Sequence, residues 1–446
     1  MGKECLHKTE KVYRPGRPER TPFYSVLFHY FDRFAAEYEF RFEKHFGRWR
    51  SIIRSTVEKF IDCGVLKNGF ARVRCEKCKN EYLLAFSCRR RDFCPSCSAK
   101  RSVIWREFVS TQVLAGCPHS HVVFSIPKMF RVLFLFHRKL LGELARCAWK
   151  AIQQYFEASA SRDLLPAGIL SIQTAGDFLN WNPHIHALIA CAVFHPDGSF
   201  QPVPLLQANI IQELFEANVF RLLVKEELIG KDFITRMRSW KHTGFQVYTG
   251  PKIVEREDIL RVGLYIVRPP VSASRLQVDQ QNGALKYLAK GAIPNDRCDS
   301  LFESAGQLFD PVDWIAKVTS HIPEAGAQIL RYCGAYSNSH RGKARKRAAQ
   351  SQEACLAAGA RHSCQPESDW LAESRRNWAA LIKLVYEVDA LLCPNCHSRM
   401  KIVSVIKDGK VIDKILTHLQ YKFDPLPLTI RPPPQTPTQW DFVSFD

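Results

Sequence analysis

Two closely spaced cysteine pairs constrain the fold of this chain more than any other feature. Cys75-Glu-Lys-Cys78 and Cys94-Pro-Ser-Cys97 are separated by about fifteen residues, a spacing typical of four-cysteine zinc ribbons and fingers. Each turn can present two thiolates to one tetrahedral ion. We therefore predict a single Zn²⁺ bound by all four cysteines, with buried reduced thiols as the alternative. Four thiolates leave no open coordination position, so this Zn²⁺ is expected to be structural.

Further cysteines leave two points open. Cys63 and Cys88 lie in the same segment and are either additional ligands or packed thiols. A third pair, Cys393-Pro-Asn-Cys396, stands far from the others and either binds metal or forms a packing turn. Its candidate metal-binding partners are His397, Cys355, His362 and Cys364.

The number of cysteines also bears on location. The chain has 16 of them, and Cys-x-x-Cys pairs in a reducing compartment indicate metal or redox chemistry rather than disulfides. The first residues do not resemble a signal peptide, and no apolar run approaches the roughly 18 residues that span a bilayer. We expect a cytoplasmic bacterial protein, associated with the nucleoid or a plasmid and not with a membrane.

The charge indicates a polyanionic partner. Lys and Arg number 63 against 44 Asp and Glu, a net charge of +19 over 446 residues, which makes nucleic acid the first candidate. Basic residues gather in the cysteine-rich segment and again near residue 345. They are interpreted as DNA-backbone contacts, with solvated surface charge as the alternative. The predicted DNA-binding residues are Arg89, Arg90, Arg91, Arg268, Lys343, Arg345, Lys346 and Arg347.

Hydrophobic periodicity predicts an α+β fold. Helical spacing covers about Tyr24 to Ile61, with a break near Gly47, and one long helix is expected from Phe130 to Phe156. Residues 121–126, 168–173 and 184–193 alternate or cluster as strands do. The predicted segments are N-terminal helices (1–62), a zinc-binding domain (63–110), a central domain (111–340), a basic linker (341–380), a small Cys-x-x-Cys module (381–424) and a Pro-rich tail (425–446).

A pair of histidines lies two residues apart on one predicted strand. His184 and His186, in Asn-Pro-His-Ile-His, must point to the same face because side chains alternate along a strand. Two neutral imidazoles on one face can bind a divalent metal, although core or surface histidines are the plainer interpretation. His119-Ser-His121 has the same spacing, but its central serine and the preceding Pro118 make a metal site there unexpected.

Several motifs together resemble a known family. His184-Ile-His186 resembles the His-hydrophobic-His motif of HUH endonucleases, specifically the rolling-circle insertion-sequence transposases that carry an N-terminal zinc-binding domain. The resemblance runs in the family's order from about residue 20 to 420. Its other motifs are Cys88 to Cys97, Leu264-Tyr-Ile-Val-Arg-Pro-Pro270, Arg331-Tyr-Cys-Gly334 through Lys343, and Cys393 to Ile402.

The resemblance implies an HUH nuclease core with a central antiparallel sheet. It also implies a DNA transposase that nicks and rejoins single-stranded DNA at element ends through a 5′-phosphotyrosine, with target DNA as the second partner. Tyr265 is the implied nucleophile, because it lies on a helix that Pro269-Pro270 ends. Tyr332 and Tyr336 are the alternatives. Many family members have a second tyrosine where this chain has Arg261, so a single-tyrosine enzyme is expected.

A phenol has a pKa near 10 and is a poor nucleophile, so the implied reaction needs Mg²⁺ or Mn²⁺ at His184 and His186. Gln173 and Asp177 are candidate further ligands. ATP is not expected, since no GxxxxGK[ST] motif is present. Two rival functions remain: a rolling-circle replication initiator, and a non-enzymatic zinc-dependent DNA-binding regulator.

Overall fold

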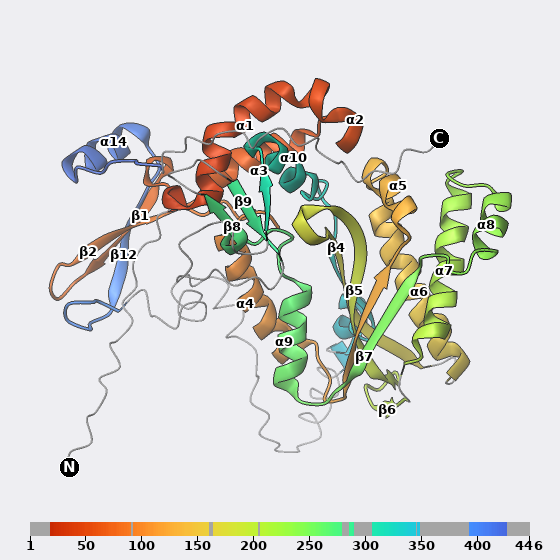
Figure 1. The fold of residues 1–446 in the computed structure, drawn as a ribbon. Coiled ribbons are helices and arrows are strands. Elements are labelled where there is room, and N and C mark those ends of the chain that lie inside the picture. The colour runs from red at the N-terminus through yellow and green to blue at the C-terminus, as the bar shows by residue number, and fades with distance from the viewer. Residues whose placement is uncertain are drawn as a thin grey trace, which may run out of the picture.

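The computed structural model describes residues 18–90, 92–159, 164–203, 206–278, 285–289, 306–344, 346–347 and 392–425 (Figure 1). The helices are α1 (Pro22–Arg41), α2 (Glu43–Phe46), α3 (Ser51–Ile61), α4 (Pro95–Gln112), α5 (Arg131–Phe136), α6 (Leu140–Ser159), α7 (Ala208–Lys225), α8 (Lys231–Arg238), α9 (Arg256–Ile266), α10 (Pro311–Ser320) and α14 (Gly409–His418). The strands are β1 (Phe70–Cys75), β2 (Glu81–Ala85), β3 (His119–Ser125), β4 (Leu165–Ala175), β5 (Trp181–Phe194), β6 (Phe200–Pro202), β7 (Gln246–Ile253), β8 (Leu276–Val278), β9 (Leu285–Leu288), β10 (Gly306–Phe309), β11 (Leu330–Gly334) and β12 (Met400–Ile406).

The largest sheet is antiparallel and has the order β11-β4-β5-β3-β7, with β6 paired to the end of β5. This confirms the predicted α+β class with a central antiparallel sheet. Strand β5 lies at its middle and is apolar along most of its 14 residues. A strand of that composition must be covered on both faces, and helices cover both faces of this one.

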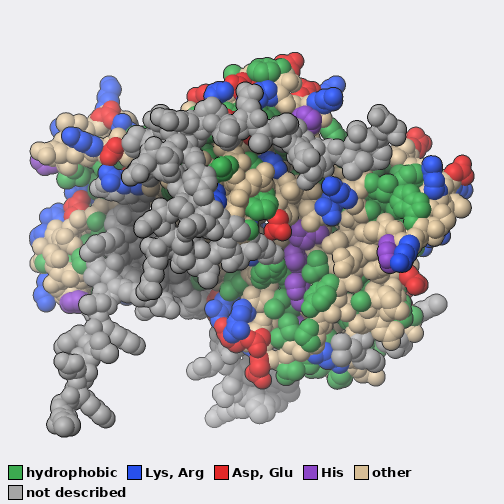
Figure 2. Space-filling model, viewed as in Figure 1, with side chains coloured by type: hydrophobic (Ala, Val, Ile, Leu, Met, Phe, Trp, Pro, Cys, Tyr) green, Lys and Arg blue, Asp and Glu red, His purple; other side chains and the backbone are tan. Residues whose placement is uncertain are grey.

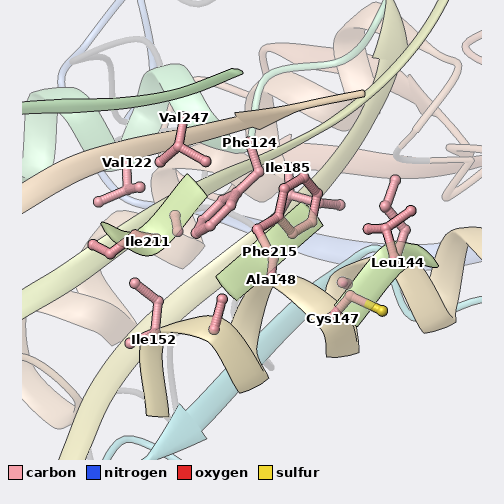
Figure 3. Packing of buried hydrophobic residues seen from close by; sticks show 14 of the residues in the cluster. Val122, Phe124, Leu144, Cys147, Ala148, Ile152, Ile185, Ile211, Phe215 and Val247 are labelled. Atoms are coloured by element: carbon pink, nitrogen blue, oxygen red, sulfur yellow. The ribbon is translucent and has the colours of Figure 1, made fainter. Parts of the chain in front are cut away.

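One face of the sheet packs against α6 and α7. Phe124 of β3, Ile185 of β5 and Val247 of β7 meet Phe215 of α7 and Ala148 of α6 in one buried cluster (Figure 3). Residues of β5 with odd numbers belong to this face. This core fixes the register of the sheet, because a shift by one residue would turn the apolar side chains to the opposite face.

The other face packs against α4 and α9. Leu188 and Ala190 of β5 are buried there with Trp105 of α4 and Ile259 of α9. The even-numbered residues of β5 belong to this face, so His184 and His186 continue it beyond the end of the apolar cluster. The sheet thus presents two imidazoles next to α9.

The N-terminal helices form a separate aromatic core with α10 and the small sheet β10-β9-β8. Phe23 packs edge-on against Phe60 and Trp314, with ring centroids 5.2 and 5.6 Å apart. The predicted break near Gly47 is confirmed: α2 ends there, and Gly47 has a φ of 82°, which side chains with a Cβ rarely adopt.

A third sheet joins distant parts of the chain. Its order is β12-β1-β2, and β12 runs antiparallel to β1 from Phe70 opposite Ile406 to Cys75 opposite Met400 (Figure 1). The predicted module 381–424 and the predicted zinc-binding segment 63–110 therefore contribute strands to one hydrogen-bonded sheet. The predicted boundaries stay predictions.

One predicted helix differs from the helices in the structure. The long helix expected from Phe130 to Phe156 is two helices, α5 and α6, separated at His137. The break turns Arg138 inward, where its guanidinium lies 4.8 Å from the Trp181 ring centroid and donates to the carbonyl of Ser320. Tertiary contacts outweigh helical periodicity at this point. Arg91, Arg345, Cys355, His362, Cys364 and the tail from residue 426 lie outside the described residues.

Candidate active site and metal centres

The paired histidines lie where β5 leaves the core. His184 is half-buried and His186 is buried, and their ring centroids are 4.9 Å apart. Nδ1 of His184 lies 2.6 Å from the carbonyl oxygen of Asn182. A carbonyl only accepts, so Nδ1 carries the proton and Nε2 is the nitrogen able to bind a cation.

A third imidazole, which was not expected at the site, comes from the neighbouring strand β3. Nε2 of His121 lies 2.9 Å from Nδ1 of His186, and the rings are nearly parallel. Burial lowers the pKa of His121, which favours the neutral ring that ligates metals. The register explains the encounter: Val123 lies opposite His186, so His121 is its diagonal neighbour on the same face.

Tyr265 reaches this group of imidazoles from α9. Its ring meets those of His186 and His121 edge-on, with centroids 5.6 and 6.1 Å away. The Arg268 guanidinium lies 3.9 Å from the Tyr265 ring centroid, a cation-π distance. Tyr265, the predicted nucleophile, thus lies beside His186, one of the two predicted metal ligands, and beside His121.

The alternative tyrosines lie elsewhere. Tyr336 is buried, and its hydroxyl lies 2.8 Å from Nε2 of His119; burial raises its pKa well above the ordinary value. Tyr332 packs against Phe108 and beneath the guanidinium of Arg341. A further tyrosine, Tyr248 on β7, is exposed, with its ring centroid 6.5 Å from that of His121.

The two candidate further ligands differ in position. Gln173 lies opposite His184 in the β4-β5 pair, and its amide donates to the carbonyl of Ile266 at the end of α9. This bond ties α9, which carries Tyr265, to β4, the strand that pairs with the histidine strand β5. Asp177 is exposed in a short 3₁₀ turn. Within the described part of the chain, it forms no group with the two histidines in which all ligand atoms lie within 4.8 Å of one another.

The donors at this site are of the chemical type that binds a divalent transition ion, but in the described residues the three imidazoles do not form a group whose ligand atoms all lie within 4.8 Å of one another. His184 and His186 present imidazole nitrogens on one face, His121 adds a third, and Gln173 lies opposite His184 on the adjacent strand. Imidazole nitrogen binds first-row ions such as Mn²⁺ more readily than Mg²⁺, which prefers oxygen ligands. The residues present therefore favour Mn²⁺ over Mg²⁺.

Eight of the cysteines form two four-thiol clusters. The first consists of Cys63, Cys88, Cys94 and Cys97, whose sulfurs all lie within 4.8 Å of one another. Sγ of Cys63 is 3.8 Å from Sγ of Cys97 and 3.7 Å from Sγ of Cys94. Tetrahedral Zn–S bonds of about 2.3 Å place sulfurs about 3.8 Å apart, so this cluster fits Zn²⁺.

Local structure favours thiolates in the first cluster. Cys94 precedes α4 and Cys97 lies in its first turn, where the helix dipole stabilises negative charge. The backbone N–H of Cys88 donates to Sγ of Cys63, and that of Arg90 donates to Sγ of Cys88. Neighbouring thiols lower the pKa of Cys97.

The predicted combination of Cys75, Cys78, Cys94 and Cys97 around one ion is wrong. Cys75 and Cys78 lie instead with Cys393 and Cys396 in the second cluster. The reason is the register of β1: it pairs with β12, which carries the distant cysteine pair to the end of β1. Cys63 and Cys88, left open by the sequence, complete the first cluster.

The predicted DNA contacts that the structure describes are surface residues with one exception. Arg89, Arg268, Lys343, Lys346 and Arg347 are exposed. Arg90 is half-buried and donates to Ser55, so it is partly occupied in joining the zinc cluster to α3. Histidine side chains also reach the surface in a row near the centre of the view in Figure 2.

A basic cleft borders the active site. Its volume is about 1210 Å³, and Gln173 and Arg268 lie on its wall. Eight Lys and Arg side chains line it against four Asp and Glu. Trp49, Phe136 and Trp181 add aromatic surface. Positive charge interleaved with aromatic rings is the composition of grooves that bind single-stranded nucleic acid.

Two family models match the chain. Residues 31–126 match a family model described as "Transposase zinc-binding domain", which contains the first cluster, and residues 168–344 match one described as "Putative transposase". No solved structure matches the chain. No helix in the described residues is long and apolar enough to cross a membrane.

Two curated relatives extend the match. The "Transposase for insertion sequence element IS801" of Pseudomonas savastanoi pv. phaseolicola is 25% identical over 314 residues, 66% of this chain and 72% of the relative. "Putative transposase y4qJ" of Sinorhizobium fredii is 25% identical over 289 residues, 60% and 70% of the two chains. With a zinc-binding domain followed by a transposase domain, this chain belongs to the family of rolling-circle insertion-sequence transposases.

Proposed function

We propose that this transposase cleaves and rejoins single-stranded DNA at the ends of a mobile element through a 5′-phosphotyrosine formed by Tyr265. The observation that carries the proposal is the edge-on contact of Tyr265 with His186 of β5 and His121 of β3. A nucleophile on a helix and metal ligands on a strand are both held by packed elements, which gives the precise positioning that phosphoryl transfer needs.

In the proposed reaction, the phenolic oxygen of Tyr265 forms a bond to the scissile phosphorus and loses its proton to solvent. The bond from phosphorus to the 3′-oxygen breaks, and that oxygen leaves as a 3′-hydroxyl. A later attack by a 3′-hydroxyl on the phosphotyrosine restores a phosphodiester and frees Tyr265. One phosphoester bond forms for each that breaks, so no ATP is consumed.

His184 and His186 would hold the divalent cation, with His121 beside them. When bound, that cation polarises the scissile phosphate and offsets the charge that develops on it. Arg268 stacks on the ring of Tyr265, so its positive charge also faces the place where the phenolate and phosphate meet. Gln173 holds the end of α9 and thereby fixes the distance of Tyr265 from β5.

The basic cleft supports single-stranded DNA as the substrate. It begins at Gln173 and Arg268 and extends past Arg48 and Lys139, which are exposed. Phe136 is exposed and Trp49 is half-buried on its wall, and both offer aromatic surface on which unpaired bases can stack. The DNA strand would enter the active site from this cleft.

The proposal is tested by incubating the purified protein with Mn²⁺ and labelled single-stranded oligonucleotides that tile the element's ends. Protein-linked DNA is then resolved on a denaturing gel. We expect an adduct that is lost in Tyr265→Phe and His184→Ala and kept in Tyr332→Phe. An adduct lost in Tyr248→Phe but kept in Tyr265→Phe would transfer the role to β7.

Two outcomes separate the rival functions. Tight DNA binding without any adduct, unchanged by Mn²⁺, would favour a non-enzymatic regulator. An adduct formed at an origin but no strand transfer between element ends and target DNA would favour a replication initiator.

A further inference from the structure

The second cysteine cluster joins two parts of the chain that are more than 300 residues apart. Sγ of Cys75 lies 3.5 Å from Sγ of Cys396, and Sγ of Cys78 lies 3.3 Å from Sγ of Cys393. All four sulfurs lie within 4.8 Å of one another. The thiols are not bonded as disulfides, and their spacing approaches the roughly 3.8 Å expected around a tetrahedral Zn²⁺.

The two Cys-x-x-Cys turns have the same backbone geometry, which packing alone does not require. The N–H of Lys79 donates to the carbonyl of Cys75, and the N–H of His397 donates to the carbonyl of Cys393, at 3.0 and 2.9 Å. Lys79 and His397 both have positive φ, 63° and 54°. Each directly follows the second cysteine of its pair.

A second pair of backbone hydrogen bonds is also the same in the two Cys-x-x-Cys turns. The N–H of Cys75 donates to the carbonyl of Asn80 at 2.8 Å, and the N–H of Cys393 donates to the carbonyl of Ser398 at 2.9 Å. Non-glycine residues with positive φ are uncommon and strained. Two such turns that face each other across four sulfurs therefore indicate a shared ligand.

The apolar packing at this end of the sheet is small. The buried cluster around the second set of thiols consists of Val73, Cys75, Cys393 and Met400. Units with so small a buried core usually need a metal, disulfide or partner. A metal ion would supply the stabilisation that this core lacks.

We propose that a second structural Zn²⁺, bound by Cys75, Cys78, Cys393 and Cys396, fastens the C-terminal module to the N-terminal hairpin of β1 and β2. Two of these ligands lie outside the residues matched by the zinc-binding family model, 31–126. The site holds β12 in register against β1. It does not depend on the nuclease chemistry proposed above.

Zinc content of the full-length protein, measured by elemental analysis, tests this directly. We expect about two Zn²⁺ per chain in the wild type and about one in the double variant Cys393→Ser with Cys396→Ser. Cys75→Ser with Cys78→Ser should lose the same ion, and all four substitutions together should still leave about one. Cys147→Ala with Cys333→Ala, which alters cysteines outside both clusters, should keep two.

The quadruple variant shows whether the two cysteine pairs share one ion. With a shared ion it keeps as much zinc as either double variant, and with separate ions it keeps less. If Cys75 and Cys78 shared an ion with Cys94 and Cys97, the Cys393 and Cys396 substitutions would change nothing, and that result would overturn the proposal. Iron in place of zinc would overturn the metal assigned.

A measurement on the wild type avoids variants that fail to fold. Cys75, Cys78, Cys393 and Cys396 should all resist alkylation in the native protein and become reactive together when a chelator removes the ion, as mass spectrometry of the labelled peptides would report. Immediate labelling of Cys393 and Cys396 while Cys75 and Cys78 stay protected would contradict a common ion.

Discussion

His121 and His186 lie on neighbouring strands with Nε2 of the first 2.9 Å from Nδ1 of the second. Their rings are 14° from parallel. At this distance the two nitrogens either share one proton or face one cation, and in both cases the orientation of His186 depends on His121. The contact therefore links β3 to the proposed metal site.

We expect His121→Ala to weaken Mn²⁺ binding about 10- to 100-fold, the usual effect of removing the partner of a metal-ligating histidine. Titration calorimetry in the absence of DNA measures this affinity. His242→Ala, which removes an exposed histidine after α8, is the control and should bind Mn²⁺ as the wild type does. An unchanged affinity in His121→Ala would mean that His186 is oriented by other contacts.

Tyr336→Phe and Tyr265→Phe should have opposite effects. The Tyr336 hydroxyl donates to Nε2 of His119 and accepts from the backbone N–H of Ala115. The Nδ1–H of His119 in turn donates to the carbonyl of Cys117. Loss of the Tyr336 hydroxyl leaves buried groups unsatisfied and should lower the free energy of unfolding by about 2 kcal/mol, with the DNA adduct retained. Urea unfolding and the adduct gel measure the two properties.

Tyr265→Phe should abolish the adduct and leave the unfolding free energy nearly unchanged, because Tyr265 is only half-buried. The opposite pattern, in which Tyr336→Phe removes the adduct without a loss of stability, would refute the assignment of Tyr265.

The paired histidines show what residue spacing can predict. Alternation along a strand places His184 and His186 on one face, and the structure has them there. His121 was set aside because its own motif carries a serine at the centre and follows a proline. Its role comes from strand order, which puts β3 beside β5, and no local pattern within residues 119–121 encodes that neighbour.

The cysteines show what residue spacing cannot predict. Proximity in sequence assigned Cys75 and Cys78 to Cys94 and Cys97, whereas pairing between β1 and β12 joins them to Cys393 and Cys396. The number of cysteines nevertheless indicated two sites. Three Cys-x-x-Cys pairs with Cys63 and Cys88 make eight thiols, enough for two four-thiol sites, while the single-site interpretation left one pair unexplained.

The basic cleft predicts a specific salt dependence of DNA binding. Arg48 and Lys139 line it and are exposed. If each contacts one phosphate, Arg48→Ala and Lys139→Ala should each reduce the slope of log K against log salt by about 0.7 for single-stranded DNA. Fluorescence anisotropy at several salt concentrations measures the slope. Lys59→Ala, on the exposed face of α3, should leave it unchanged, and an equal effect there would indicate diffuse attraction rather than a bound path.

His321 should make stability fall with decreasing pH. It is buried: Nε2–H donates to the carbonyl of Leu179, Nδ1 lies 3.0 Å from the hydroxyl of Thr174, and Trp181 stacks on the ring. Burial lowers its pKa to about 3. The unfolded chain, with a histidine pKa near 6.5, takes up the proton first, so protonation favours unfolding.

His321 therefore contributes its full stabilisation above pH 6.5 and should lose about 1.4 kcal/mol for each pH unit below that value, down to its folded pKa. Urea unfolding between pH 7.5 and 5 measures the slope. His321→Gln cannot titrate in this range, so its unfolding free energy should fall less steeply with pH by that amount, even though the variant is less stable at pH 7.5. Parallel slopes in the two proteins would show that His321 is not held neutral, and the lost stability would then have to come from other groups.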